Sequence, residues 1–244
     1  MNFKQNIYLI LLTTFFHVNA SSQDTSIAKL SRIDSIVDTM NLKMEFEPSE
    51  LAYSITEPFD TDSEKVRAIY YWMTKNISYD YKAFLNSSSL KYDIYGKETI
   101  DDYYYRRICH TILIKKGICE DYALLFQFLC KSNKIPCEMV IGYGLITRPT
   151  NFLKLSLTED SSNHAWNAVK LNKKWYLIDV TFASGYIDLN KVKFVKHRND
   201  RYYLTLPSIF ILDHHPIDSQ WQLLEKPFDI NSFINNAKYN RETE

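Results

Sequence analysis

Glycine is scarce, with 5 residues in a chain of 244. The sequence contains no Gly-x-Gly-x-x-Gly or P-loop pattern, which argues against dinucleotide and nucleoside triphosphate sites. A basic excess is also absent, because 29 basic residues are matched by 29 acidic ones. This balance argues against a nucleic-acid binder. What remains, 45% hydrophobic and 24% charged residues, is typical of an ordinary globular protein rather than a disordered one.

Cysteine is also sparse. The chain has four, at Cys109, Cys119, Cys130 and Cys137. This is too few for a disulfide scaffold of this length, and no spacing is Cys-x-x-Cys. No histidine pair has zinc spacing, and the adjacent His214-His215 would point apart on a helix or a strand. We therefore expect surface or core histidines there, no structural metal and no cofactor.

The first 20 residues are predicted to be a secretory signal peptide. Lys4 precedes an apolar stretch from Ile7 to Phe16, and small residues follow in His17-Val-Asn-Ala20. The stretch of about ten residues is short of the roughly 20 that span a bilayer, although an uncleaved anchor is an alternative. We expect an exported protein, periplasmic or extracellular, with no permanent membrane span after cleavage.

Helical patterns occupy the first half of the mature chain. Apolar spacing predicts an amphipathic helix near residues 25–42, and Thr61-Asp-Ser-Glu64 is a capping box that begins another. A third helix is expected from Asp101 to Ile114, and a fourth begins at Cys119, two residues after Gly117. The polar, tyrosine-rich stretch from Ser78 to Glu98 is predicted to be a long loop.

Strand patterns follow. The predicted strands are Cys137–Leu145, His164–Leu171, Lys174–Phe182 and Arg201–Leu206. Helices first and strands afterwards indicate an α+β fold, with the N-terminal helices packed on an antiparallel sheet. No composition break divides the mature chain, so residues 21–244 are predicted to form a single domain. Residues 147–163 are expected to be a loop insertion.

The spacing of the strands brings two polar side chains together. If Asn172-Lys173 is a two-residue turn, His164 lies opposite Thr181, and Asp179 lies on the same face two residues away. Such diagonal neighbours are roughly 7–8 Å apart, within reach of an imidazole and a carboxylate. A three-residue loop would instead place them on opposite faces.

Cys119 is the third candidate. A thiol in the first turn of a helix lies at the positive end of the helix dipole, which favours the thiolate. Beside an imidazole it would be a nucleophile, with Asp179 orienting the ring of His164 and the Cys119 backbone N–H donating to an oxyanion. Taken singly, a cysteine is more often an inert core residue and a histidine more often a structural one, and Asp179 could be only a residue of a strand-end turn.

Three motifs resemble those of the transglutaminase-like superfamily, in the same order. Lys116-Gly-Ile-Cys-Glu-Asp-Tyr-Ala123 is similar to the nucleophile motif, His164-Ala-Trp-Asn167 to the histidine motif and Trp175-Tyr-Leu-Ile-Asp-Val-Thr181 to the aspartate motif. The segment Phe59–Asp80 is similar to the helix that precedes the core in members of the kyphoscoliosis-peptidase type. With Trp221-Gln-Leu-Leu224, the resemblance covers most of residues 51–225, the expected core.

The resemblance implies a papain-like fold and a Cys-His-Asp triad. Carried over position by position, Cys119 would be the nucleophile, His164 the general base and acid, and Asp179 the orienting carboxylate. Phe182 is a departure, because members often have Trp there, although aromatic bulk is kept. A second oxyanion donor is not placed; Tyr79 and Tyr81 are candidates by position only, and a core or covering role is equally open.

The predicted function is exported, cysteine-dependent acyl transfer on a protein or peptide substrate. The thioester would be released to water by a peptidase or amidase, or to a lysine amine by a crosslinking transglutaminase; hydrolysis is favoured because water is the more abundant acceptor. One alternative is a non-catalytic module that binds a peptide or glycan. Another is a latent enzyme whose cleft is covered by residues 21–60 or by Ser78–Glu98.

Other residues near the motifs have structural explanations. Trp166 and Trp175 are expected to be wall and core residues, and Glu120-Asp121 to complement a helix N-terminus. Cys130 and Cys137 are expected to be small buried hydrophobes, although a disulfide between them is an alternative in an exported protein.

Overall fold

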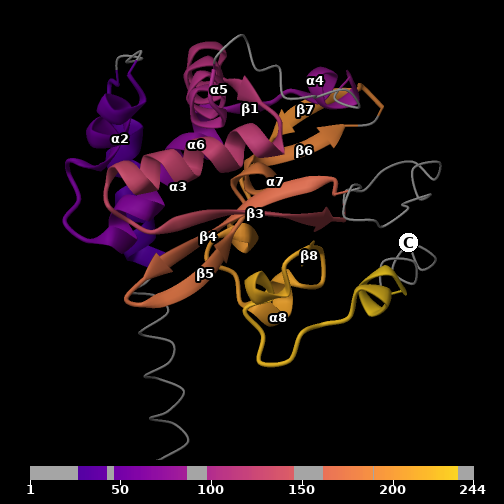
Figure 1. Ribbon diagram of the computed structural model, residues 1–244. Coiled ribbons are helices and arrows are strands. Elements are labelled where there is room, and N and C mark those ends of the chain that lie inside the picture. The colour runs from indigo at the N-terminus through magenta and orange to yellow at the C-terminus, as the bar shows by residue number, and fades with distance from the viewer. Residues whose placement is uncertain (1–26, 43–46, 87–97, 146–161, 189, 236–244) are drawn as a thin grey trace, which may run out of the picture. The chain divides into compact units, whose positions relative to one another are not determined.

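The computed structural model describes residues 27–42, 47–86, 98–145, 162–188 and 190–235 (Figure 1). The predicted signal peptide lies outside these residues, and so does nearly all of the expected loop insertion at 147–163. No helix in the described part of the chain combines the length and apolar character needed to cross a membrane.

The described residues fall into two units, divided between Asn41 and Leu42. In the first unit, residues 27–39 form a helix in which Ile33 and Val37 are buried. This confirms the helix expected near residues 25–42. The second unit holds all the motifs. The single domain expected over residues 21–244 stays a prediction.

The second unit begins with helices. They are α2 (Pro48–Thr56), α3 (Asp62–Asn76), α4 (Tyr81–Asn86), α5 (Ile100–Ile114) and α6 (Cys119–Ser132). The predicted capping box begins α3: the N–H of Glu64 donates to Oγ1 of Thr61 over 3.3 Å, and the N–H of Thr61 donates back to Glu64 over 3.2 Å. The starts of α5 and α6 agree with the sequence prediction within one residue.

A four-stranded antiparallel sheet forms the centre of the fold, in the order β5-β4-β3-β8. Its strands are β3 (Cys137–Gly144), β4 (His164–Leu171), β5 (Lys174–Ile178) and β8 (His214–Pro216). Asn172 and Lys173 both have positive φ, at 49° and 66°, as a type I′ turn requires. Leu171 therefore pairs with Lys174, which confirms the predicted register. The fold is α+β, as expected.

The two faces of the sheet are covered differently (Figure 1). Helix α6 packs against β3 and β4, and α3 packs against α6. On the other face lies α8 (Pro207–Phe210), which packs against β5. Val140, Trp166, Leu177 and Phe210 form a buried cluster there, with Trp175 packed against its edge. Trp166 and Trp175 are thus the core and wall residues that the sequence indicated.

Two strand predictions were wrong. The strand expected at Lys174–Phe182 ends at Ile178, because the carboxylate of Asp179 accepts the N–H groups of the next turn and begins helix α7 (Val180–Ser184). The segment Arg201–Leu206 is not a strand. It begins within the 3₁₀ helix η4 (Asp200–Tyr202), where buried Arg67 pairs with Asp200 over 2.9 Å and Thr205 forms an isolated bridge.

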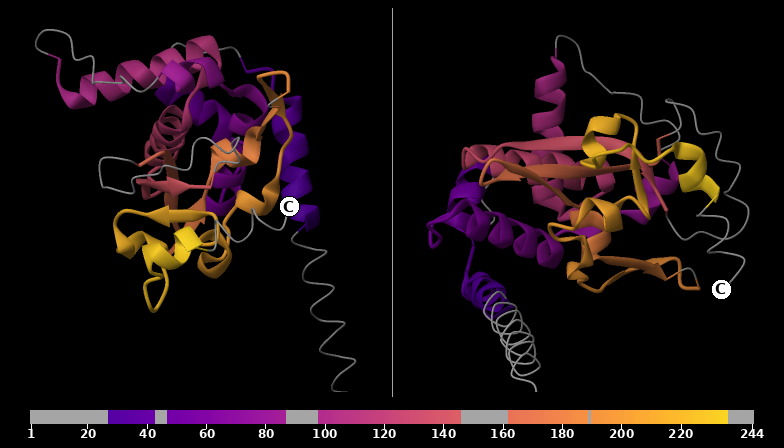
Figure 2. Two further views of the ribbon diagram at one scale, coloured as in Figure 1. Left: turned by 90° about the vertical axis from the view of Figure 1, so that its right-hand side faces the viewer. Right: turned by 90° about the horizontal axis from the view of Figure 1, so that it is seen from below.

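The loop expected from Ser78 to Glu98 begins with regular structure. Strand β1 (Ser78–Tyr79) pairs in parallel with β2 (Lys116–Gly117), and α4 follows it, while residues 87–97 lie outside the described part. A further hairpin, β6 (Gly185–Asp188) and β7 (Lys193–Lys196), lies apart from the four-stranded sheet (Figure 2). The chain then continues through η5 (Ser219–Gln222) to a helical turn at 230–235.

Strand β8 approaches β3 so closely at Gly142 that this position has no room for a side chain. A Cβ atom there would lie 2.3 Å from the backbone oxygen of His215 and 2.7 Å from Cα of Pro216. Backbone atoms of β8 cannot move without breaking its pairing with β3. We expect Gly142→Ala to lower the free energy of unfolding in urea by about 3 kcal/mol, the upper range for an overpacked core.

The matched control is Ile141→Ala on the same strand, where the side chain is 43% exposed. We expect it to change the unfolding free energy by much less than Gly142→Ala. Equal urea midpoints for Gly142→Ala and the parent protein would contradict the close approach of β3 and β8.

Candidate active site

Cys119 lies in the first turn of α6 and is 7% exposed. The turn before it is fixed by Asp121, whose Oδ2 accepts the N–H of Ile118 over 2.9 Å. Gly117 allows this packing, because a Cβ there would lie 2.6 Å from Cβ of Asp121. The sequence Gly-Ile-Cys-Glu-Asp thus builds a tight helix start with the thiol at its N-terminal end.

The acidic pair beside Cys119 has the structural role that the sequence indicated. Arg107 of α5 forms ion pairs with both Glu120 and Asp121, and its Nε donates to Asp121 over 2.8 Å. Burial lowers the pKa of Arg107, but the charges of Asp121 and Glu120 outweigh it and the net shift is upward. The pair therefore fixes α5 against the start of α6.

The structure brings His164 and Asp179 together. Nε2 of His164 lies 2.7 Å from Oδ2 of Asp179, and the two residues are 4% and 0% exposed. The predicted register places the two strand ends side by side, but Asp179 itself lies just beyond the ladder. Its other oxygen, Oδ1, accepts the backbone N–H groups of Thr181 and Phe182 over 2.7 and 3.0 Å. The carboxylate is thereby fixed in direction.

The charges of this site depend on one another. Burial lowers the pKa of His164. The charge and the hydrogen bond of Asp179 outweigh burial, and a smaller contribution comes from the hydrogen bond and charge of Cys119, so the pKa of His164 is raised above its usual value. Burial raises the pKa of Asp179, but His164 and His214 outweigh it and lower it. Because Nε2 of His164 bonds Asp179, Nδ1 is the ring nitrogen that remains for another partner.

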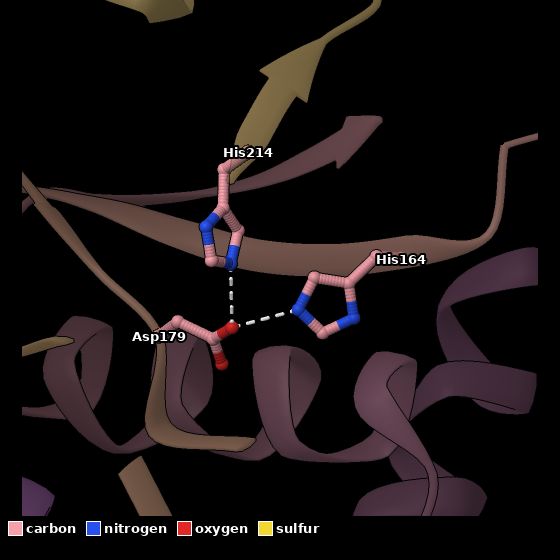
Figure 3. A group of neighbouring side chains, drawn as sticks. All are labelled: His164, Asp179 and His214. Atoms are coloured by element: carbon pink, nitrogen blue, oxygen red, sulfur yellow. Dashed lines mark hydrogen bonds and ion pairs between the residues drawn. The ribbon is translucent and has the colours of Figure 1, made fainter. Parts of the chain in front are cut away.

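His214 is the residue that sequence reasoning missed. It is fully buried on β8, and its Nε2 lies 2.9 Å from the same Oδ2 of Asp179 that His164 contacts (Figure 3). Both histidines are core residues, as expected, and His215 bonds the backbone oxygen of Phe228, but the contact of His214 with Asp179 was not expected. A three-residue strand carries no periodic signal, so nothing in the sequence indicated this contact.

Both ring nitrogens of His214 face carboxylates. Nδ1 lies 2.7 Å from Oδ1 of Asp213, and the other oxygen of Asp213 pairs with Arg201 over 3.1 Å. The two carboxylates hold the His214 ring in one orientation, and the ring stacks on Phe210 with the centroids 4.1 Å apart.

His164, Asp179 and His214 also offer the donor types of a metal site, with ligand atoms within 4.8 Å of one another. The separations of 2.7 and 2.9 Å, however, are those of direct charge-assisted hydrogen bonds. With Oδ1 of Asp179 held by two backbone N–H groups, the cluster is complete as a hydrogen-bonded network.

The remaining sequence candidates also have defined places. The ring of Phe182, where Trp is common in the family, lies 4.5 Å from the ring of His164, so aromatic packing on the imidazole is kept. Tyr79 and Tyr81 line the same cavity as His164. Cys130 and Cys137 are free, fully buried thiols, and burial followed by the hydrogen bond from Cys130 raises the pKa of Cys137.

Asp179→Asn keeps the size of the side chain and removes its charge. We expect the pKa of His164 to fall, because the charge and hydrogen bond of Asp179 are the largest contributions that raise it. Histidine NMR titration of the parent and the variant measures this shift, with His164→Gln to assign the signal. Asp218→Asn, at the start of η5, is the control and should leave the pKa of His164 unchanged. Equal values in Asp179→Asn and parent would contradict the coupling.

Comparisons with known proteins identify the family of this chain. The family model of the transglutaminase-like superfamily matches residues 49–180. Kyphoscoliosis peptidase of Homo sapiens is 32% identical over 193 residues, which are 79% of this chain and 27% of that protein. Hillarin of Drosophila melanogaster is 26% identical over 189 residues, 72% of this chain and 20% of Hillarin. The chain thus spans about a quarter of the length of these relatives.

A solved structure described as that of a TGase is similar over 74% of this chain and 41% of that one, with 18% identity and a TM-score of 0.38. The assignment to a family rests on the sequence match and not on this likeness. Since residues 49–180 make up more than half of the 244 residues, the chain belongs to the transglutaminase-like superfamily.

Proposed function

We propose that this protein is a cysteine-dependent acyl-transfer enzyme that attacks amide bonds of a protein or peptide. The observation that carries the proposal is the buried bond from His164 to Asp179, with the Cys119 side chain contributing to the raised pKa of the same imidazole. A nucleophile, a base and a group that orients the base are the three parts of such a site. Membership of the transglutaminase-like superfamily supports it.

In the proposed reaction, His164 holds the proton of Cys119 and the thiolate sulfur attacks the amide carbonyl carbon. The S–C bond forms as the carbonyl π electrons move to oxygen, and the backbone N–H of Cys119 donates to this oxyanion. The C–N bond then breaks, Nδ1–H of His164 protonates the leaving amine, and a thioester remains. Asp179 keeps Nε2–H in place and stabilises the imidazolium throughout.

We propose hydrolysis as the second step. His164 takes a proton from water as the water oxygen attacks the thioester carbon. The C–S bond then breaks, which releases the carboxylic acid product and restores the Cys119 thiolate beside protonated His164. A lysine amine could replace water, and the product would then be an isopeptide crosslink. Water is favoured because it is the more abundant acceptor, and one relative carries the name peptidase. The predicted signal peptide supports export, so the substrate would lie in the periplasm or outside the cell.

A labelling experiment tests the nucleophile. Iodoacetamide should alkylate Cys119 faster than the other three thiols, measured by peptide mass spectrometry on the mature protein. Partly exposed Cys109 is the internal comparison, and His164→Gln should slow alkylation of Cys119 by about tenfold or more while leaving Cys109 unchanged. If Cys109 reacts faster than Cys119 in the parent protein, the proposed nucleophile is wrong.

A peptide library with and without a primary amine distinguishes the outcomes. Hydrolysis predicts cleaved peptides that are absent with Cys119→Ala and present with Cys109→Ala. Amine adducts in place of cleavage would indicate a transglutaminase. Neither product, together with retained binding of peptides by Cys119→Ala, would favour the alternative of a non-catalytic binding module.

A further inference from the structure

A cavity of about 300 Å³ lies beside the candidate active site, with His164 in its lining. Half of the residues that line it are Phe or Tyr, contributed by β1, α4, α7, β6, β7 and η4. These elements come from two stretches of the chain, residues 78–86 and 180–202, so the fold gathers rings from distant parts of the sequence around one space. The volume is at the lower end for small-ligand sites, which suits a single side chain rather than a folded segment.

The rings of the cavity are held by one another. On one side, the ring of Tyr79 packs against Phe84 and Phe194 with centroids 5.9 and 6.3 Å away. On the other side, Phe182 lies 4.5 Å from His164 and 5.4 Å from Tyr202. Rings fixed in this way form walls that exist before a ligand arrives, which lowers the entropy cost of binding.

Strand β7, which carries Phe194, is attached to the end of α3. The ammonium group of Lys196 donates to the backbone oxygens of Thr74 and Ile77, each over 2.8 Å. Burial lowers the pKa of Lys196 to about 8. The lysine is thus occupied with the helix end, where it neutralises the partial negative charge of the terminal carbonyls.

The only charge that the described lining residues offer is that of His164, which is already paired with Asp179. In the described part of the chain the lining includes no Asp, Glu, Lys or Arg, and its polar groups are imidazoles, hydroxyls, backbone and one amide. An ionic side chain that entered would lose its hydration without meeting an unpaired counter-charge. An aromatic or large aliphatic side chain would instead bury apolar surface against the rings and gain favourable ring contacts.

We propose that this cavity binds an aromatic or bulky apolar side chain of the substrate, next to the amide bond that is attacked. The inference rests on the proposed function, because it is His164 that links the cavity to the reacting bond. It defines the substrate class as peptides or proteins with an exposed Phe, Tyr, Trp or Leu beside the scissile amide.

Protection from alkylation tests this. The mature protein is treated with iodoacetamide in the presence of the N-acetyl amides of phenylalanine, alanine, lysine or glutamate, and the alkylation rate of Cys119 is measured. We expect phenylalaninamide to protect at a concentration about tenfold or more below that required of alaninamide, because a phenyl ring is buried. The two charged amides should protect no better than alaninamide. Equal protection by all four would overturn the proposal.

Variants at Ile187, which lines the cavity on β6, sharpen the test. Ile187→Glu should weaken protection by phenylalaninamide and introduce protection by lysinamide. Ile187→Gln introduces a side chain of the same size as Glu but without charge, and it should not introduce protection by lysinamide. Phe194→Ala should weaken protection by phenylalaninamide and leave protection by lysinamide unchanged. This variant keeps the test valid if Ile187→Glu disturbs folding. Tyr53→Ala, on α2 and 67% exposed, is the control and should change nothing.

The two proposals fail in different ways. If Cys119 shows no preferential alkylation without ligand, the proposed function fails. Binding of each amide to the cavity is then measured by NMR, from the chemical-shift changes of the Ile187 methyl groups. If Cys119 is preferentially alkylated but no apolar preference appears, only the assigned substrate class fails.

Discussion

The site depends on how one buried carboxylate, that of Asp179, is satisfied. Two backbone N–H groups of α7 donate to one of its oxygens, and the imidazoles of His164 and His214 donate to the other. An unpaired carboxylate in this fully buried position would be strongly unfavourable. Four donors make it favourable, and they join β4, α7 and β8 at one point. The orientation of the base is therefore fixed by the fold and not by the triad alone.

Strand β8 has a larger role than its three residues suggest. Its pairing with β3 requires the close approach at Gly142, and that pairing places His214 within hydrogen-bond distance of the carboxylate of Asp179. Asp213, paired with Arg201, supplies the second acceptor for the His214 ring. Aromatic rings of Trp166, Phe182 and Phe210 surround this ring and exclude water, which strengthens each hydrogen bond in the network.

The sequence predicted the parts of the site that local rules determine. A two-residue turn with both residues at positive φ sets the register of His164, and glycine followed by a helical pattern places Cys119 at a helix start. It did not predict α7, because the capping of this short helix by Asp179 competes with a strand pattern that continues to Phe182. Nor did it predict β8 or the conformation at Arg201–Leu206, since short segments take their structure from tertiary contacts such as the pair of Arg67 with Asp200.

The central claim is that Asp179 is an anion to which two imidazoles donate at once. Nitrogen-15 NMR of protein labelled in histidine measures this directly at neutral pH, because protonated and unprotonated ring nitrogens have well-separated shifts. The account predicts that Nε2 of His164 and Nε2 of His214 both carry hydrogens, and that Asp213→Asn changes the signals of His214. An unprotonated Nε2 on His214 would contradict it, since that nitrogen could then not hold the carboxylate that orients the base.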